Sequence, residues 1–579
     1  MKPHTHRGLG DVVVALACLG AAGPLLAQTA PAAPTNAGRA LESTTPAQPQ
    51  EIHKDANVLP PADAPRAAAG AEGPTLMVKG FALLGNTIFP SDELLALVHP
   101  WVGKAAGTDQ LLDAAEAIKN RYKDAGFFLT QVLVPAQEVP DGIVTLRVVE
   151  ARIGETRAEV TTQRVSPALV DGYMKLLPKG SPVTEQNVER PLLLLNDLPG
   201  VKVTSVLRPG AETGEADLLV KMADEGKTFG GDGYVDNAGS QSTGEARVGA
   251  DLVANGLLGL GESWTLGGLA SQQNGIDLVR AGVTAPVGYS GTKATGSVTY
   301  LHYNVLGSQF KALGADGDAA VGSLIVQHPV IRSRNFNLFA VGGADLKSLD
   351  DRTSGGPDQP KNHDERLLMI GHLGVTGDFR DERFGGSLNS FTLTASAGHN
   401  KIRTASELQQ DQNGGHKTAG TFEHLDGDYQ RLQAITDTTS VLLSMRGQIA
   451  FQNLDTSEKS SLGGPRGVRA FAVGDGVGDD LFQGTLELRQ RVPALTLWNA
   501  PFVLSAFVDG GRVKSFHDPI EGEDTTNLRT LGGYGMGLNM TSRDNFQFRL
   551  DVAHRINRSD LPGSDNRMTR AWASLQKWF

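Results

Sequence analysis

Cysteine is nearly absent from this sequence. The single cysteine among 579 residues is Cys18, which lies in an N-terminal segment that we expect to be removed. The mature chain would then have no thiol, which excludes disulfides, thiolate metal sites and cysteine nucleophiles. Long apolar runs are missing too, because no stretch beyond the N-terminus reaches the roughly 18 apolar residues that a membrane helix needs. A membrane protein without such runs must be a closed β-barrel.

Signatures of catalysis and cofactor binding are also missing. The sequence contains no P-loop, no GxSxG, no HExxH and no metal-spaced cluster of cysteine or histidine. Its 13 histidines are scattered along the chain. We therefore expect no enzymatic activity, no cofactor and no metal site. The net charge of -11 argues against nucleic acid as a partner.

The N-terminus has the pattern of a secretory signal peptide. Basic residues precede an apolar run from Val12 to Ala22, and Ala27 offers a small residue for cleavage, which predicts a signal peptide over 1–27. Residues 28–74 are rich in Ala, Pro, Thr and Gln, and this composition predicts a disordered linker. Only a patch around Arg39 to Ser43 is weakly helical.

Two stretches, 75–154 and 155–224, share one plan. Each has a strand, two helices and two further strands in its pattern of apolar residues, caps and glycines. This order predicts two small α+β domains. In the second, the leucine-rich run Glu189–Val201 predicts a core helix, although Pro191 should kink or delay it.

From Lys227 onward the pattern predicts strands alone. Apolar and polar residues alternate with a period of two, as in a sheet with one face toward lipid. Phe502, Leu504, Ala506 and Val508 share the apolar face, so Asp509 points away from lipid. Lumen-lining candidates are the charged residues Glu487, Arg489, Arg491, Arg549 and Asp551.

The C-terminal part predicts five strands in which short and long connections alternate. The short connections fall at Pro493–Ala500 and Ser542–Asn545, and the long ones at Lys514–Asn527 and Asn557–Asn566. Short periplasmic turns and long surface loops alternate in this way in outer-membrane barrels. Before these strands comes Leu462–Asp480, which is too long and too rich in glycine for a hairpin turn. Spacing alone leaves open whether this loop is exposed or buried.

This loop and the segment Phe507–Arg512 resemble the most diagnostic motifs of the two-partner secretion transporters. These form the TpsB, or haemolysin-activator, family of outer-membrane proteins with POTRA domains. Its loop carries VRGY or VRAY at the tip and folds back into a sixteen-stranded barrel, where the arginine meets an aspartate of the inner wall. The resemblance maps the tip onto Val468-Arg469-Ala470-Phe471 and the wall aspartate onto Asp509. Ala470 and Phe471 depart from the VRGY form without affecting the charge pair.

Other segments carry the same resemblance. They are the POTRA opening at Val78–Thr87, the barrel entry DNxGxxxTG at Asp236–Gly244, and the terminal aromatic signal for barrel assembly at Trp578-Phe579. The resemblance implies POTRA 1 over 75–154, POTRA 2 over 155–224 and an antiparallel barrel over 225–579, with sixteen strands and an inward-folding loop at about 453–481. Relatives carry a short helix that plugs the pore, and this is the alternative to a linker at 28–74.

The implied function is two-partner secretion. The chain would lie in the outer membrane of a Gram-negative bacterium with its POTRA domains in the periplasm, and would secrete a large β-helical exoprotein. Its partners would be that exoprotein, outer-membrane lipid and the barrel assembly machinery. A haemolysin, an adhesin, a contact-dependent toxin or a haem-acquisition protein would all suit such a transporter. Two alternatives remain from the sequence: an insertase of the same superfamily, and a passive porin.

Overall fold

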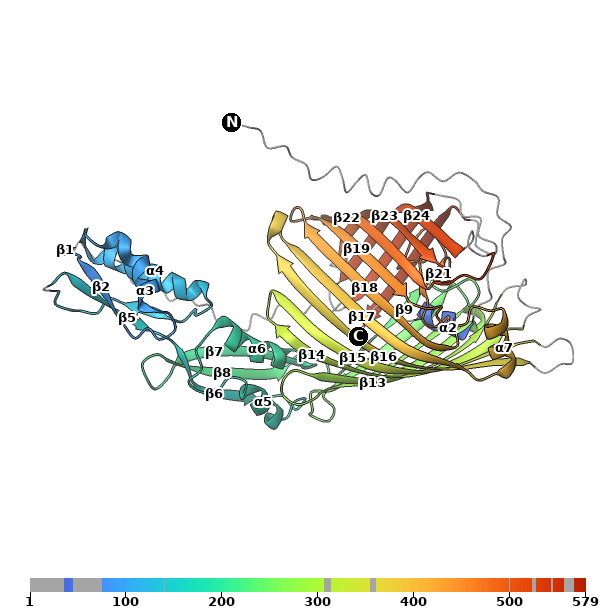
Figure 1. Cartoon of the computed structure of the whole chain (residues 1–579), viewed down its shortest axis with the longest axis horizontal. Helices are drawn as coiled ribbons and strands as arrows, with labels where there is room; N and C mark the ends of the chain where they lie inside the picture. Colours follow the sequence, from blue (N-terminus) through green and yellow to red (C-terminus); the bar gives the residue numbers. More distant parts are fainter. Residues whose placement is uncertain are drawn as a thin grey trace, which may run out of the picture.

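A computed structural model describes residues 36–44, 75–139, 141–306, 314–354, 361–498, 500–522, 527–542, 545–556 and 567–579. The predicted signal peptide and most of 28–74 lie outside these residues. Figure 1 shows two small α/β units in a row, followed by a large β-barrel. In the part of the chain that the structure describes, no helix is both long and apolar enough to cross a membrane.

The first α/β unit has a three-stranded sheet of order β2-β5-β4 with two helices packed on it. Its elements are β1 (Leu76–Met77), β2 (Gly80–Leu84), α3 (Ser91–Val98), β3 (Ala105–Ala106), α4 (Thr108–Asp124), β4 (Gln131–Leu133) and β5 (Ile143–Val149). The apolar face of α4 is buried through Leu111, Ala115, Ile118 and Tyr122. These residues recur every three or four positions, so one helix face can cover the sheet.

A buried carboxylate closes the first unit. Glu150 accepts hydrogen bonds from the backbone and hydroxyl of Thr87, from the backbone of Ile88 at 2.8 Å and from the Tyr122 hydroxyl at 2.7 Å. Burial alone would raise the pKa of Glu150, but these hydrogen bonds bring it below its usual value. The turn between β2 and Thr87 contains Gly85. Its φ of +92° suits glycine, and the carbonyl of Val148 leaves no room for a Cβ at this position.

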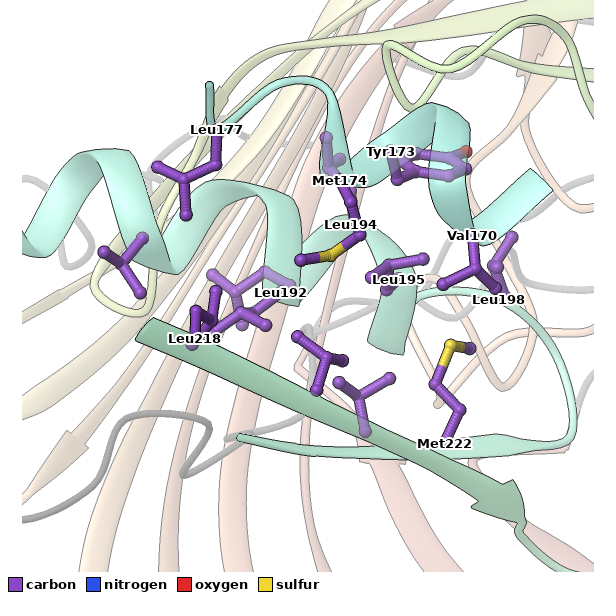
Figure 2. Packing of buried hydrophobic residues seen from close by; sticks show 14 of the residues in the cluster. Val170, Tyr173, Met174, Leu177, Leu192, Leu194, Leu195, Leu198, Leu218 and Met222 are labelled. Carbon is purple, nitrogen blue, oxygen red and sulfur yellow. The ribbon is translucent and has the colours of Figure 1, made fainter. Parts of the chain in front are cut away.

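The second unit repeats the plan. It contains β6 (Arg152–Val160), α5 (Pro167–Met174), α6 (Glu185–Asn196), β7 (Val201–Pro209) and β8 (Glu215–Asp224), with sheet order β6-β8-β7. Figure 2 shows the leucines of α6 and the residues of α5 meeting Leu218 and Met222 of β8.

The expected delay of the helix by Pro191 is wrong. Helix α6 runs unbroken through Pro191, after Thr184 caps it by accepting a hydrogen bond from the backbone of Asn187. Proline removes the hydrogen bond to the carbonyl four residues earlier, which is that of Asn187. Asn187 is exposed, so water can donate a hydrogen bond to its carbonyl. The four buried leucines that follow Pro191 fix the helix on the sheet.

Sixteen antiparallel strands form a closed barrel in which the last strand pairs with the first. The strands are β9 (Phe229–Asp236), β10 (Arg247–Asn255), β11 (Ser263–Ser271), β12 (Ile276–Pro286), β13 (Lys293–Asn304), β14 (Asp316–Arg332), β15 (Phe336–Thr353), β16 (Asn362–Asp381), β17 (Ser387–Ile402), β18 (Gly420–Ala434), β19 (Thr439–Ala450), β22 (Asp480–Leu497), β23 (Ala500–Lys514), β24 (Leu528–Ser542), β25 (Phe546–Arg555) and β26 (Thr569–Trp578). The predicted fold, with POTRA-like units before a sixteen-stranded barrel, is confirmed.

The ends of the barrel differ. We call the end with short connections the turn end and the opposite end the loop end. The turn-end connection predicted at Pro493–Ala500 is wrong in length, because β22 continues past Pro493 to Leu497. Proline cannot donate a ladder hydrogen bond, and the register shifts between Val492 and Thr496 to accommodate it. Helix α7 (Ala405–Asn413) lies in the loop-end connection between β17 and β18.

Within the part of the chain that the structure describes, two segments lie inside the barrel lumen. Helix α2 (Ala37–Thr44) packs with Ala37 and Ala40 against inward residues of the wall, among them Leu301 and Leu349. The connection between β19 and β22, residues 451–479, also folds inward, and we call it the inward loop. It contains the short paired strands β20 (Ser460–Ser461) and β21 (Val477–Gly478). Both segments bring polar groups from distant parts of the chain into the lumen.

Candidate functional site in the barrel lumen

The tip of the inward loop is buried inside the barrel. Val468, Ala470 and Phe471 have no exposed surface, and they pack with Phe507 and Leu531 of the wall. This close approach needs glycine on the wall, since a Cβ added to Gly533 would lie 2.6 Å from that of Ala470. The small side chain of Ala470 and the missing side chain of Gly533 together allow the loop tip to lie against the wall strand.

Arg469 lies at the centre of this packing. Its guanidinium donates to both carboxylate oxygens of Asp509, from Nε and Nη2 at 2.9 Å each, and to Glu487 from Nη1 at 2.8 Å. Asp551 lies 3.8 Å from Nη1. The guanidinium also stacks over Phe507, 3.2 Å from the ring centroid. We call Arg469, Asp509, Glu487 and Asp551 the Arg469 site.

The acids of the Arg469 site have further partners. Arg489 Nε donates to Glu487 at 2.8 Å, Arg549 Nε donates to Asp551 at 2.7 Å, and the Thr485 hydroxyl donates to Asp509 at 2.9 Å. These contacts orient the carboxylates that receive Arg469. Asp509 is 1% exposed and Arg469 is 3% exposed, so the pair is shielded from bulk water.

A cavity of about 360 Å³ lies beside this site at the turn end. All five predicted lumen residues line it: Glu487, Arg489, Arg491, Arg549 and Asp551. The turn residues 436–438 also contribute to its wall. The structure thus brings these five residues together beneath the loop tip, with arginines toward the cavity and the two acids more deeply buried.

Two wall residues that the sequence did not single out hold the backbone of the tip. Trp572 Nε1 donates to the carbonyl of Arg469 at 2.7 Å, and Arg555 Nε donates to that of Ala470 at 3.2 Å. Arg555 also lies over the Phe471 ring, 4.3 Å from its centroid. Alternation along β25 and β26 could have shown that both face inward, but nothing local shows what they contact.

The C-terminal residues lie at the barrel seam. Trp578 ends β26 and is paired in register with Asp232 of β9. The backbone of Phe579 donates to the carbonyl of Gly231 at 3.0 Å, while its side chain is 55% exposed. This exposed aromatic side chain stands away from the lumen site.

Both ends of helix α2 are bound to the wall near the loop end. At its N-terminus the backbone N–H of Ala37 donates to Asp351 at 2.7 Å. At its C-terminus Arg247 Nη1 donates to the carbonyl of Ser43 at 3.1 Å, while pairing with Asp236 at 2.8 Å. A carboxylate at the first turn and a cation at the last both complement the helix dipole.

The second α/β unit is docked on the turn end of the barrel. Asp197 receives two hydrogen bonds from Arg332, at 2.8 and 2.7 Å, and Glu189 pairs with Arg334. Arg190 donates to the carbonyl of Pro329 at 2.8 Å. The leucine-rich segment thus supplies more than a core, because its polar residues bind the barrel.

A closed barrel with an inward loop and α/β units docked at its turn end defines an outer-membrane transporter with POTRA domains. Comparison with known proteins agrees. Residues 76–151 match the family model "POTRA domain, ShlB-type", and residues 214–353 match "Haemolysin secretion/activation protein ShlB/FhaC/HecB". Both matches are to two-partner secretion transporters, and they identify this chain as an outer-membrane transporter of that type, which exports a partner exoprotein. The family predicted from the sequence is therefore confirmed.

Similarity extends over most of the chain. The heme/hemopexin transporter protein HuxB of Haemophilus influenzae (strain 86-028NP) is 26% identical over 497 residues, which cover 84% of each chain. The outer membrane transporter CdiB of Escherichia coli is 24% identical over 501 residues, 83% of this chain and 79% of the relative. The solved structure of CdiB from Escherichia coli shares the fold, with a TM-score of 0.68 at 21% identity and coverage of 89% and 93%.

Proposed function

We propose that this transporter exports one large β-helical exoprotein as an unfolded chain, through a lumen that α2 and the inward loop fill in the resting state. The observation that carries this proposal is how both segments are held. Each lies inside a closed barrel and is bound by ion pairs and hydrogen bonds to side chains of the wall. Polar contacts of this kind can be exchanged for water or for a passing chain, so both segments can leave and return.

The periplasmic units would receive the exoprotein by strand addition. In the described residues, β2 and β4 are the edges of the first sheet and β6 and β7 those of the second. An extended peptide can add to such an edge through backbone hydrogen bonds, with side-chain pockets giving selectivity. β7 spans nine residues and alternates buried and more exposed side chains, which suits a peptide of similar length. Docking of the second unit on the turn end of the barrel, the end at which the cavity also lies, would then direct the chain into the lumen.

The cavity beneath the loop tip is the proposed entrance to the pore. Its arginines and carboxylates offer hydrogen bonds to an extended backbone. The Arg469 site would hold the loop tip in place until the exoprotein arrives. We assign α2 the role of a plug at the loop end, which is the alternative to a disordered linker that the sequence left open for residues 28–74.

The outer face of the barrel and the pairing of its last and first strands support two further partners, outer-membrane lipid and the barrel assembly machinery. Leu324, Leu346, Leu373 and Leu504 project outward with roughly half or more of their surface exposed, which supports contact with outer-membrane lipid. Trp578 ends the last strand and Phe579 follows it, which supports recognition by the barrel assembly machinery. Orientation follows, with the turn end periplasmic and the loop end at the cell surface.

The proposed function leads to the question of which exoprotein is exported. One relative is named a heme/hemopexin transporter, which supports a haem-acquisition protein as one candidate cargo. Quantitative proteomics of medium, cell surface and outer membrane, with and without this transporter, tests the proposal. Loss of one large exoprotein is expected. A fall across many outer-membrane barrels would favour the insertase alternative, and no change in any protein would favour the porin.

A further inference from the structure

Arg366 occupies an unusual position between the two segments that fill the lumen. It projects inward from β16 near the loop end and is 7% exposed. Its Nη2 donates to Asp351 of β15, and its Nη1 donates to Asp455 of the inward loop at 2.8 Å. One guanidinium therefore binds two carboxylates: Asp351, which contacts α2, and Asp455, which is part of the inward loop.

The first carboxylate anchors helix α2. Asp351 accepts the hydrogen bond from the backbone of Ala37, the first residue of α2, and another from the Tyr303 hydroxyl at 2.6 Å. A carboxylate at this end of a helix is stabilised by the helix dipole. Arg366 fixes the carboxylate that performs this role, although none of its described hydrogen bonds reaches α2 itself.

The second carboxylate organises the start of the inward loop. Asp455 Oδ1 accepts a hydrogen bond from the backbone of Ser457 at 2.9 Å, which shapes the turn. That turn touches α2, since a Cβ added to Gly38 would lie 2.5 Å from the backbone nitrogen of Ser457. Helix and loop therefore meet at their backbones, and neither can shift far without disturbing the other.

Helix α7 adds a third carboxylate from the loop end. Glu407 lies 3.7 Å from Arg366 Nε. Burial raises the pKa of Glu407 to about 7 and outweighs the lowering effect of Arg366, and the nearby acids Asp364, Asp455 and Asp351 add to the rise. A partly protonated Glu407 leaves most of the charge of Arg366 to Asp351 and Asp455.

We propose that Arg366 is a positioning residue that couples the lumen helix to the inward loop, so that displacement of either one favours displacement of the other. The proposal rests on the proposed function, in which both segments leave the lumen during export. When the loop moves away with Asp455, Arg366 loses the hydrogen bond that fixes the orientation of its guanidinium, so it no longer holds the Asp351 carboxylate in place for the backbone of Ala37. Linkage requires the reverse effect to have the same size.

Pairs of spin labels on the full-length transporter in lipid bilayers test this coupling. Cys18 lies in the predicted signal peptide, so pairs of cysteines can be introduced into the rest of the chain without a competing native thiol. One pair joins Ser43→Cys in α2 to a site on the barrel wall, and a second joins Val473→Cys in the inward loop to the same site. Distance distributions then give the displaced fraction of each segment.

The informative variants change one side and are observed on the other. Asp455→Asn should raise the displaced fraction of α2 roughly fivefold or more, and Asp351→Asn should do the same for the inward loop. Arg366→Gln should displace both. Arg280→Gln is the matched control, because Arg280 pairs with Asp251 in the lumen at 2.6 Å and none of its described contacts reaches α2 or the inward loop. It should displace neither segment.

The outcomes separate this proposal from the proposed function. If Asp455→Asn displaces only the loop and Asp351→Asn only the helix, Arg366 is structural and the coupling is refuted. If the segments move together but exoprotein export does not change, the coupling stands and the gating role fails. Arg366→Lys keeps the charge with fewer donors and should give an intermediate coupling, provided that the barrel still folds, as heat-modifiable gel mobility shows.

Discussion

Removal of Arg469 is the most direct test of the lumen site. Arg469 is 3% exposed, and the side chains of Asp509 and Glu487 are 0% and 6% exposed. Arg469→Ala would leave Asp509 buried without a cation, while Glu487 keeps Arg489, and stranding the Asp509 carboxylate costs about 3–5 kcal/mol. Since each 1.4 kcal/mol is a factor of ten, the equilibrium for docking of the loop tip would shift by roughly two to three and a half orders of magnitude.

The structure also predicts an asymmetry between the two partners. In Asp509→Asn, Arg469 keeps Glu487 at 2.8 Å and Asp551 at 3.8 Å, and the amide can still accept one hydrogen bond. The expected cost is about 1–3 kcal/mol. Arg489→Ala is a suitable control, because Arg489 is a third exposed and pairs with Glu487 from the cavity side, where about 0–1 kcal/mol is expected.

Two assays follow these changes. Proteolysis of intact cells reports whether the inward loop has left the lumen, and export of the exoprotein is normalised to folded barrel in the membrane. We expect loop protection and export to fall most in Arg469→Ala, less in Asp509→Asn and little in Arg489→Ala. Normal protection and export in Arg469→Ala would refute the role of the ion pair. If loop protection and export fall as much in Asp509→Asn as in Arg469→Ala, Glu487 does not help to hold Arg469 in place.

Three further predictions concern other parts of the chain. Glu150→Gln should destabilise the first periplasmic unit by about 1–3 kcal/mol. Because the folded pKa of Glu150 is below its usual value, the stabilisation by its carboxylate is present above about pH 4.3 and is lost as pH falls through the folded pKa. Hydrogen exchange in α4 would detect this loss. Asp197→Ala should loosen the second unit from the barrel by about 3 kcal/mol by stranding Arg332, and broader spin-label distances between unit and barrel would report this. For Glu407, with its pKa raised to about 7, packing of α7 should weaken as pH rises from about 4.3 through 7, and Glu407→Gln should abolish the pH dependence of hydrogen exchange in α7.

Strand alternation and motif resemblance predicted much of the fold. A period of two along β22 and β23 assigned Asp509 and Glu487 to the interior, and both lie there. Inward or outward orientation is a local property of a strand, so the sequence contains it. Residues 76–151 and 214–353, where motifs were recognised, also match family models.

Contacts between distant residues were less predictable. Nothing near Trp572 indicates that it binds the carbonyl of Arg469, 103 positions away. The leucine-rich segment was interpreted only as core, because its periodicity reports the buried face and not what Asp197 meets on the barrel. Helix α2 gave only a faint signal, since its eight residues are fixed by contacts at both ends and would be marginal as an isolated helix.

The interior of this barrel combines two kinds of contact with different consequences. Apolar packing of Val468, Ala470 and Phe471 gives the loop tip a defined place, but an unfolded chain cannot easily substitute for such packing. The ion pairs of Arg469 and Arg366 are different, because water and polar groups of a passing chain can solvate each partner once the segment moves. Under the proposed function, in which the lumen closes tightly and reopens, polar anchors are therefore favourable, because the cost of breaking them falls once an entering exoprotein hydrates the lumen.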